Sequence, residues 1–213
     1  MGKRVNDSDL NRRPIAARDT GWARAIAARL VRTNITPNQI SMASVLFAAI
    51  GAAALLWWPG IPGFLLCVLC IQLRLLCNLF DGLVAVEGGK ASPLGRIYNE
   101  FPDRITDTLF IVALGYAAGM PWLGWLGALF AVATAYVRVF GGSLGLVQDF
   151  RGPVAKQQRM ALQTLGCLGA IAESFFHAER YSLIAAAVLI AAGSLITCIT
   201  RTRVIVVQLQ RQS

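Results

Sequence analysis

Charged residues are scarce in this chain of 213 residues, where they make up 15% of the sequence. Soluble proteins carry roughly 25% charged residues, so the composition argues against a soluble domain. Positions 33–73, 108–137 and 182–200 hold no charged side chain. The remaining charges still sum to +9, from 20 Lys and Arg against 11 Asp and Glu. Nucleic-acid binders place their basic residues on polar domains. An apolar basic chain instead predicts a polytopic membrane protein with cationic loops and no nucleic-acid partner.

Histidine and cysteine are too few and too dispersed to predict a zinc site or a disulfide framework. The single histidine, His177, falls in a predicted loop, and all five cysteines fall inside apolar segments. Cys67 and Cys70 form a CxxC pair, but no second pair of cysteines or histidines accompanies it. We therefore expect the cysteines to be small, buried hydrophobic residues.

The apolar runs predict an all-α fold with six transmembrane helices. A span needs about 20 mostly apolar residues. The run from 33 to 73 is too long for one span, and Pro and Gly residues at 59–63 interrupt it. A second break stands at 119–121. We expect helices at 38–58, 63–86, 94–118, 122–145, 158–176 and 181–205. Lys and Arg gather before residue 33, in the second and fourth loops and in the C-terminal tail, which predicts two cytoplasmic termini.

The N-terminal segment begins with charged residues and has no short apolar region of the kind found in signal peptides. Within 20–32, Trp22, Ile26 and Leu30 recur every four residues, which predicts an amphipathic helix at the cytoplasmic membrane surface. The alternative is a basic tail held by anionic lipid. We expect a cytoplasmic N-terminal segment at 1–34, a six-helix transmembrane domain at 35–206 and a cytoplasmic tail at 207–213. A bacterial inner membrane is the expected location.

Ionisable side chains inside a span cost about 2.5–3.5 kcal/mol each, so they mark candidate functional residues. Here polar residues gather where the second predicted helix ends and the third begins: Asn78, Asp81, Asn99, Glu100, Asp103, Arg104 and Asp107. Spacings of three and four residues place each set on one helical face. The short intervening loop makes the two helices antiparallel neighbours, so both sets lie near the cytoplasmic end.

Two interpretations of this cluster are open. The acids pair internally with Arg74, Arg104 and Arg138 and hold the bundle together, or carboxylate and amide oxygens bind Mg²⁺, Mn²⁺ or Ca²⁺. Gly82 and Gly95 beside the cluster allow a ligand to approach the backbone, although small residues also serve helix packing.

The segment resembles the signature of the CDP-alcohol phosphotransferase family. That signature is Asp-x-x-Asp-Gly-x-x-Ala-Arg, eight residues, and Gly-x-x-x-Asp-x-x-x-Asp. The chain reads Asn-Leu-Phe-Asp-Gly-Leu-Val-Ala-Val at 78–86 and Gly-Arg-Ile-Tyr-Asn-Glu-Phe-Pro-Asp at 95–103. Every spacing is kept, and five identities match: Asp81, Gly82, Ala85, Gly95 and Asp103. The resemblance extends over nearly the whole chain.

Three positions depart from the signature. Asn78 and Asn99 stand where the family has metal-binding Asp, and Val86 stands where it has Arg. The chain is either a divergent active member, with charge supplied by nearby residues, or a non-catalytic relative. The several acids kept at a cost inside the membrane favour the active member.

The resemblance implies a membrane transferase of phospholipid biosynthesis. It moves a substituted phosphate group from a CDP-alcohol, such as CDP-diacylglycerol, to an acceptor hydroxyl and releases CMP. Asp103 corresponds to the general base. The expected ligands of two Mg²⁺ or Mn²⁺ ions are Asn78, Asp81, Asn99, Glu100, Asp103 and Asp107. The residues expected to admit the cytidine diphosphate are Gly82, Ala85 and Gly95. The expected phosphate- or acceptor-binding residues are Arg138, Arg151, Lys156 and Arg159.

A scaffold of the same fold and a small transporter are the alternatives. Transport is disfavoured because the charges gather at one end of two helices and not near the middle of the membrane. Family members are often homodimers, so a homodimer is expected.

Overall fold

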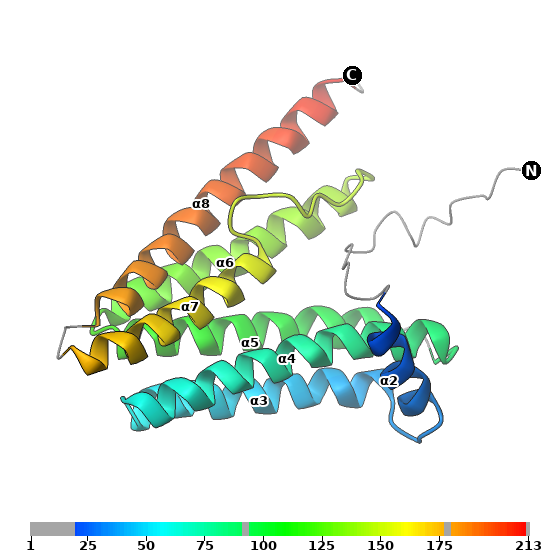
Figure 1. Ribbon diagram of the computed structural model, residues 1–213. Helices are drawn as coiled ribbons and strands as arrows, with labels where there is room; N and C mark the ends of the chain where they lie inside the picture. Colours follow the sequence, from blue (N-terminus) through cyan, green and yellow to red (C-terminus); the bar gives the residue numbers. More distant parts are fainter. Residues whose placement is uncertain (1–19, 91–93, 177–179, 212–213) are drawn as a thin grey trace, which may run out of the picture.

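Every regular element in the described part of the chain is an α-helix, in agreement with the predicted fold class. The computed structural model describes residues 20–90, 94–176 and 180–211. Its helices are α2 (Gly21–Val31), α3 (Pro37–Trp57), α4 (Ile61–Glu87), α5 (Gly95–Ala117), α6 (Pro121–Ser143), α7 (Lys156–Phe175) and α8 (Tyr181–Gln210) (Figure 1). The six predicted helices correspond to α3 to α8. The largest difference is that α8 continues to Gln210. His177 lies outside the described residues.

Four of the described helices, α3, α4, α6 and α8, are long and apolar enough to cross a membrane. The chain is therefore a membrane protein. α5 and α7 do not meet the same measure, since they carry most of the charged side chains of the bundle. Length and composition thus support four of the six expected spans.

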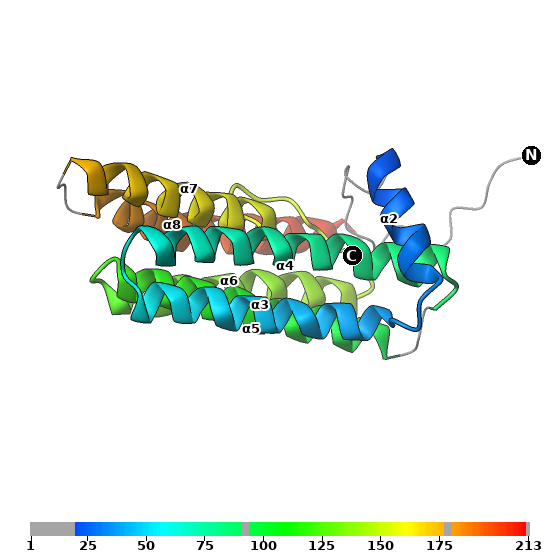
Figure 2. The same ribbon diagram turned by 60° about the horizontal axis from the view of Figure 1, so that its bottom comes forward.

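The helices form two groups that contact each other along their inner sides. α3 packs against α4 and α5, and α8 packs against α6 and α7, while contacts of α5 with α6 and of α4 with α7 join the groups. The two groups converge at one end of the bundle and diverge at the other, where the segment between α6 and α7 lies (Figure 1). Figure 2 shows the helices of both groups running side by side. The end of α4 and the start of α5 lie on the diverging side.

Close helix packing depends on small residues. Gly115 on α5 faces Gly124 on α6 so closely that an added Cβ on Gly115 would lie 2.5 Å from the Gly124 Cα. Such backbone contact is typical of membrane helices. Cys67, Cys70 and Cys167 are buried free thiols in the apolar core, as predicted, whereas Cys77 and Cys198 are half-buried.

The converging end is held by Arg180, the residue before α8. Its guanidinium donates to Pro59 O at 2.8 Å and to Ala117 O at 3.3 Å, and lies 5.7 Å from the centre of the Phe64 ring. Arg180 therefore ties the α3–α4 turn to the α5–α6 turn. Four exposed tryptophans occur in or beside these two turns: Trp57, Trp58, Trp122 and Trp125. Tryptophan is enriched where membrane proteins meet the lipid–water interface.

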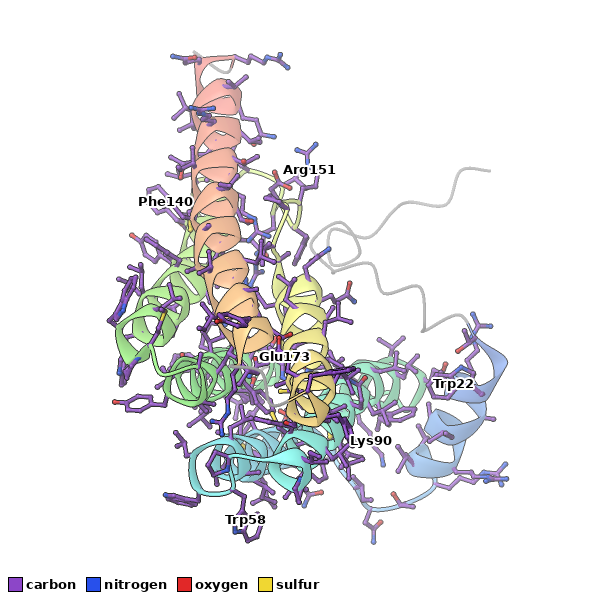
Figure 3. The ribbon with its side chains drawn as sticks, turned by 60° about the vertical axis from the view of Figure 1, so that its left-hand side comes forward. Trp22, Trp58, Lys90, Phe140, Arg151 and Glu173 are labelled. Carbon is purple, nitrogen blue, oxygen red and sulfur yellow. The ribbon has the colours of Figure 1, made fainter. Side chains whose placement is uncertain are left out.

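The diverging end carries α2, at the place where the amphipathic helix was predicted. Ala23 and Ala27 are buried against the end of α4, while Trp22 and Ile26 are largely exposed. Figure 3 shows Trp22 on α2 and Lys90 beyond α4. Lys90 donates to three backbone carbonyls between α2 and α3, at 2.8–3.3 Å, and so fixes α2 to the bundle. The position of α2 at a membrane surface stays a prediction.

Candidate functional site

Asp107 is the most deeply buried acid of the predicted cluster, with 1% of its surface exposed. Arg74 NH2 donates to its Oδ1 at 2.7 Å, and Arg159 NH2 donates to its Oδ2 at 2.7 Å. Arg74 also donates to Thr106 Oγ1 at 2.8 and 3.1 Å. Asp107 thus joins α4, α5 and α7 by charge-assisted hydrogen bonds. Both of its oxygens are used by guanidinium groups, which differs from the metal-ligand role expected from the sequence.

Asp103 lies one turn before Asp107 and meets three cations. The Lys156 ammonium pairs with its Oδ1, Arg74 NH2 lies 3.5 Å from the same oxygen, and Arg104 NH2 lies 3.7 Å from Oδ2. The Lys156 ammonium also donates to Asn78 Oδ1 at 2.9 Å. Lys156 is the first residue of α7, so its ammonium links α7 to Asn78 on α4 and to Asp103 on α5.

Asp81 is also buried, and a neutral hydroxyl bonds to it. Ser41 of α3 donates to Asp81 Oδ2 at 2.7 Å. Among the described residues, no ion pair within 4.0 Å reaches Asp81. It is therefore the acid of the cluster whose charge is least compensated.

The two Asn residues occupy different surroundings. The amide nitrogen of Asn78 donates to Arg74 O at 3.1 Å, and its oxygen accepts from Lys156. Asn99, at the open start of α5, is exposed. The three residues expected at the cytidine diphosphate, Gly82, Ala85 and Gly95, are half-buried on the adjoining parts of α4 and α5.

Arg138 pairs with Glu100, and not with the central acids. Its NH2 donates to both Glu100 oxygens, at 2.6 and 2.7 Å, and its NH1 donates to Gln148. The guanidinium lies 5.0 Å from the centre of the Phe150 ring. Glu100 therefore bonds a buried cation of α6, an arrangement that the internal-pairing interpretation foresaw and the metal interpretation did not.

Arg151 is the most accessible of the expected phosphate-binding cations, with 78% of its side chain exposed. It pairs with Asp149 at 3.0 Å, and Figure 3 shows it on the loop beside α8. Partial burial tends to raise the pKa of Asp149, but hydrogen bonds from Arg151 hold it below the ordinary value. Arg203 of α8 and Arg211, the residue after α8, line a groove with Arg151. No motif in the sequence indicates this basic groove; the arginines near the end of the chain are its only signal.

Two other site contacts also escaped the sequence analysis. The Ser41 hydroxyl gave no signal, because its partner Asp81 lies 40 positions away. Arg201, counted only as a cation of the tail region, is 5% exposed and donates to Arg151 O at 2.9 Å and Thr134 O at 2.7 Å. Arg201 therefore ties the loop between α6 and α7 to α6 and α8.

The described residues contain no group of three or more His, Cys, Asp or Glu side chains placed to hold a metal ion. Asp81 and Asp103 remain as carboxylates at the site, and the amide oxygen of Asn99 lies on the same face of α5 as Asp103. Oxygen donors of this kind fit one hard divalent cation. The family signature has four Asp residues at these positions. This chain has two acids, Asp81 and Asp103, and two amides, Asn78 and Asn99.

Comparisons with known proteins find similar sequences and a similar fold. A scan against models of protein families finds no match. The archaetidylinositol phosphate synthase of Aeropyrum pernix is 32% identical over 166 residues, which cover 78% of this chain and 81% of that protein. The phosphatidylinositol phosphate synthase of Streptomyces avermitilis is 28% identical over 199 residues, covering 88% and 77%.

Solved structures agree with the fold. The phosphatidylinositol phosphate synthase of Mycobacterium tuberculosis with CDP-DAG bound has a TM-score of 0.68 at 21% identity, covering 86% of this chain and 92% of that one. The same enzyme in complex with manganese and citrate also gives 0.68, covering 86% and 88%.

Proposed function

This chain belongs to the CDP-alcohol phosphotransferase family, and we propose that it transfers a phosphatidyl group from CDP-diacylglycerol to a hydroxyl of an inositol phosphate. The observation that carries the proposal is the site itself. Asp81 and Asp103 keep the family spacing and lie at the same end of the bundle, among buried cations. The names of the relatives and the CDP-DAG bound to the solved neighbour support the choice of donor and acceptor.

The reaction is a single displacement at phosphorus. The acceptor hydroxyl oxygen bonds to the β-phosphorus, the bond from that phosphorus to the bridging oxygen breaks, and CMP departs with that oxygen. The hydroxyl proton passes to Asp103, which acts as general base. When bound, a divalent cation neutralises pyrophosphate charge; Asp81 and Asp103, with amide oxygens, are the residues that would hold it. Phosphoryl transfer otherwise depends mainly on positioning.

The basic groove along the end of α8 suits a phosphorylated acceptor. Arg151 is exposed at its edge, while Arg159 is occupied by Asp107 and Arg138 by Glu100. We assign the first contact with the acceptor phosphate to Arg151. Arg151→Ala is expected to raise the KM for inositol phosphate about tenfold with little change in kcat, because one charged hydrogen bond to the ligand is lost.

The membrane arrangement follows from the same assignment. In it α5 and α7 complete six spans, with their charged sides turned toward the site and away from lipid. Both termini are cytoplasmic, the segment 1–34 lies on the membrane surface, 35–206 forms the transmembrane domain and 207–213 the tail. The inner membrane of a bacterium and a homodimeric assembly complete the proposal.

The direct test is CMP release by the purified protein in phospholipid–detergent micelles containing CDP-diacylglycerol, inositol phosphate and Mg²⁺ or Mn²⁺. Asp103→Asn is expected to lower turnover by about 10²–10⁴-fold, as loss of a general base does. Glu173→Gln, at the other end of α7 from Lys156, is the matched control with unchanged turnover. No CMP release with this pair of substrates would refute the assignment.

A non-catalytic role is favoured by one observation, the presence of Asn78, Asn99 and Val86 at signature positions. The double change Asn78→Asp and Asn99→Asp distinguishes a catalytic from a non-catalytic role. If CMP appears only with the double variant, the natural chain is a scaffold. If the natural chain turns over, the Asn residues belong to a working site.

A further inference from the structure

The Lys156 ammonium lies inside the acidic cluster, at a place where a cation is needed. Only 12% of its side chain is exposed. It bonds to Asn78 Oδ1 at 2.9 Å and pairs with Asp103 Oδ1, one partner from α4 and the other from α5. Lys156 is also the first residue of α7, next to the positive end of the helix dipole, which disfavours a cation. The contact with Asp103 compensates that unfavourable position.

Asn78 is oriented for this ammonium. Its amide nitrogen donates to Arg74 O at 3.1 Å, so its oxygen turns toward Lys156. The hydrogen-bond network thereby fixes the orientation of the amide. An Asp at position 78 has no donor for the Arg74 carbonyl. Asn is therefore the residue that satisfies both the backbone acceptor and the lysine donor.

Charge balance points the same way. Three buried acids, Asp81, Asp103 and Asp107, face the buried Arg74 and Arg159 and the half-buried Lys156. Asp107 is fully engaged by the two arginines, and Asp103 shares one oxygen with Lys156. What remains is the charge of Asp81, which no ion pair within 4.0 Å compensates among the described residues. One divalent cation at Asp81 answers that charge, whereas a second ion would lie against the ammonium without a free carboxylate to compensate it.

We propose that the Lys156 ammonium permanently fills one cation position of this site, so that the chain binds one divalent ion and not two. Asn78 and Lys156 act as a matched pair: the amide removes a negative charge, and the lysine supplies a fixed positive one. The remaining ion lies toward Asp81. This inference rests on the proposed function, because it concerns the same site.

The test counts Mn²⁺ ions per chain by electron paramagnetic resonance on the purified protein, without substrates. The natural chain is expected to bind one ion. Asn78→Asp with Asn99→Asp provides four carboxylates but keeps Lys156, and it is expected to bind one ion still. Adding Lys156→Gln to that pair is expected to give two, since the ammonium no longer occupies the second position.

Two ions in the natural chain, or none, would overturn the proposal, and so would a triple variant that binds no more than the double. The ion count of the natural chain tests the proposal even if a variant does not fold. Gel filtration and a melting curve show whether each variant is folded. The count is independent of turnover. A chain that binds one Mn²⁺ but releases no CMP refutes the transferase and leaves the lysine assignment standing.

Discussion

Replacing Asp107 with Asn removes the carboxylate that two buried guanidinium groups share. Asp107 is 1% exposed, Arg74 is 0% and Arg159 is 1%, so water does not replace the lost charge. Both bonds measure 2.7 Å. The Asn amide keeps the size of the side chain but offers one oxygen, and its NH₂ group faces a guanidinium donor.

The expected loss of stability is large. Breaking a buried ion pair by removing one partner costs about 3–5 kcal/mol. A chain of this size loses roughly 2–4 °C of unfolding temperature per kcal/mol. The Asp107→Asn variant should therefore unfold about 6–20 °C below the natural protein.

The measurement is a thermal unfolding curve in detergent, followed by intrinsic tryptophan fluorescence. Asp149→Asn is the matched control, because its partner Arg151 is 78% exposed. Exposed pairs contribute little, so this control should unfold within about 1 °C of the natural protein. An Asp107→Asn variant as stable as the Asp149→Asn control would refute the reasoning that Asp107 holds three helices together by charge.

Three further changes test other parts of the bundle. Gly115→Ala should lower the unfolding temperature by about 5 °C or more, because its Cβ would enter the backbone of Gly124 and force α5 from α6. Arg180→Gln should also lower it, by a few degrees, with unchanged CMP release, since its two carbonyl contacts lie at the far end from the site. Ser41→Ala should reduce kcat/KM by about tenfold in the same CMP assay, because Asp81 loses a charged hydrogen bond that fixes its position.

Each change has a comparison within the chain. Gly21→Ala adds a Cβ with nothing within 4 Å and should leave stability unchanged, so equal effects at Gly21 and Gly115 would contradict the packing argument. Ser44→Ala removes a hydroxyl that donates to the Ser41 carbonyl at 2.6 Å and does not reach Asp81. An equal loss of activity in both serine variants would exclude a specific role for Ser41. Reduced CMP release after Arg180→Gln would contradict its purely structural role.

Hydropathy and turn residues located the helices from the sequence because both signals are local. The interruption at 59–63 overlaps the turn at 58–60 between α3 and α4, and the predicted start at 94 lies one residue from Gly95, where α5 begins. Spacing within a helix also placed Asp103 and Asp107 on one face correctly, since a turn has a fixed period. The internal-pairing interpretation named Arg74, Arg104 and Arg138 as partners, but the contacts of Lys156 and Arg159 with these acids were not foreseen.

The amino-acid sequence by itself determined that this is a helical membrane protein, where its helices lie, and that it carries a spaced acidic motif. Each of these three features depends on residues that lie within a single helix or a single motif. Only the tertiary structure decided which cation each acid meets. Lys156 reaches Asn78 across 78 positions, and Arg159 reaches Asp107 across 52. The reason is physical: the sequence lists many cations of equal charge, and burial with helix packing selects the few that lie within bonding distance.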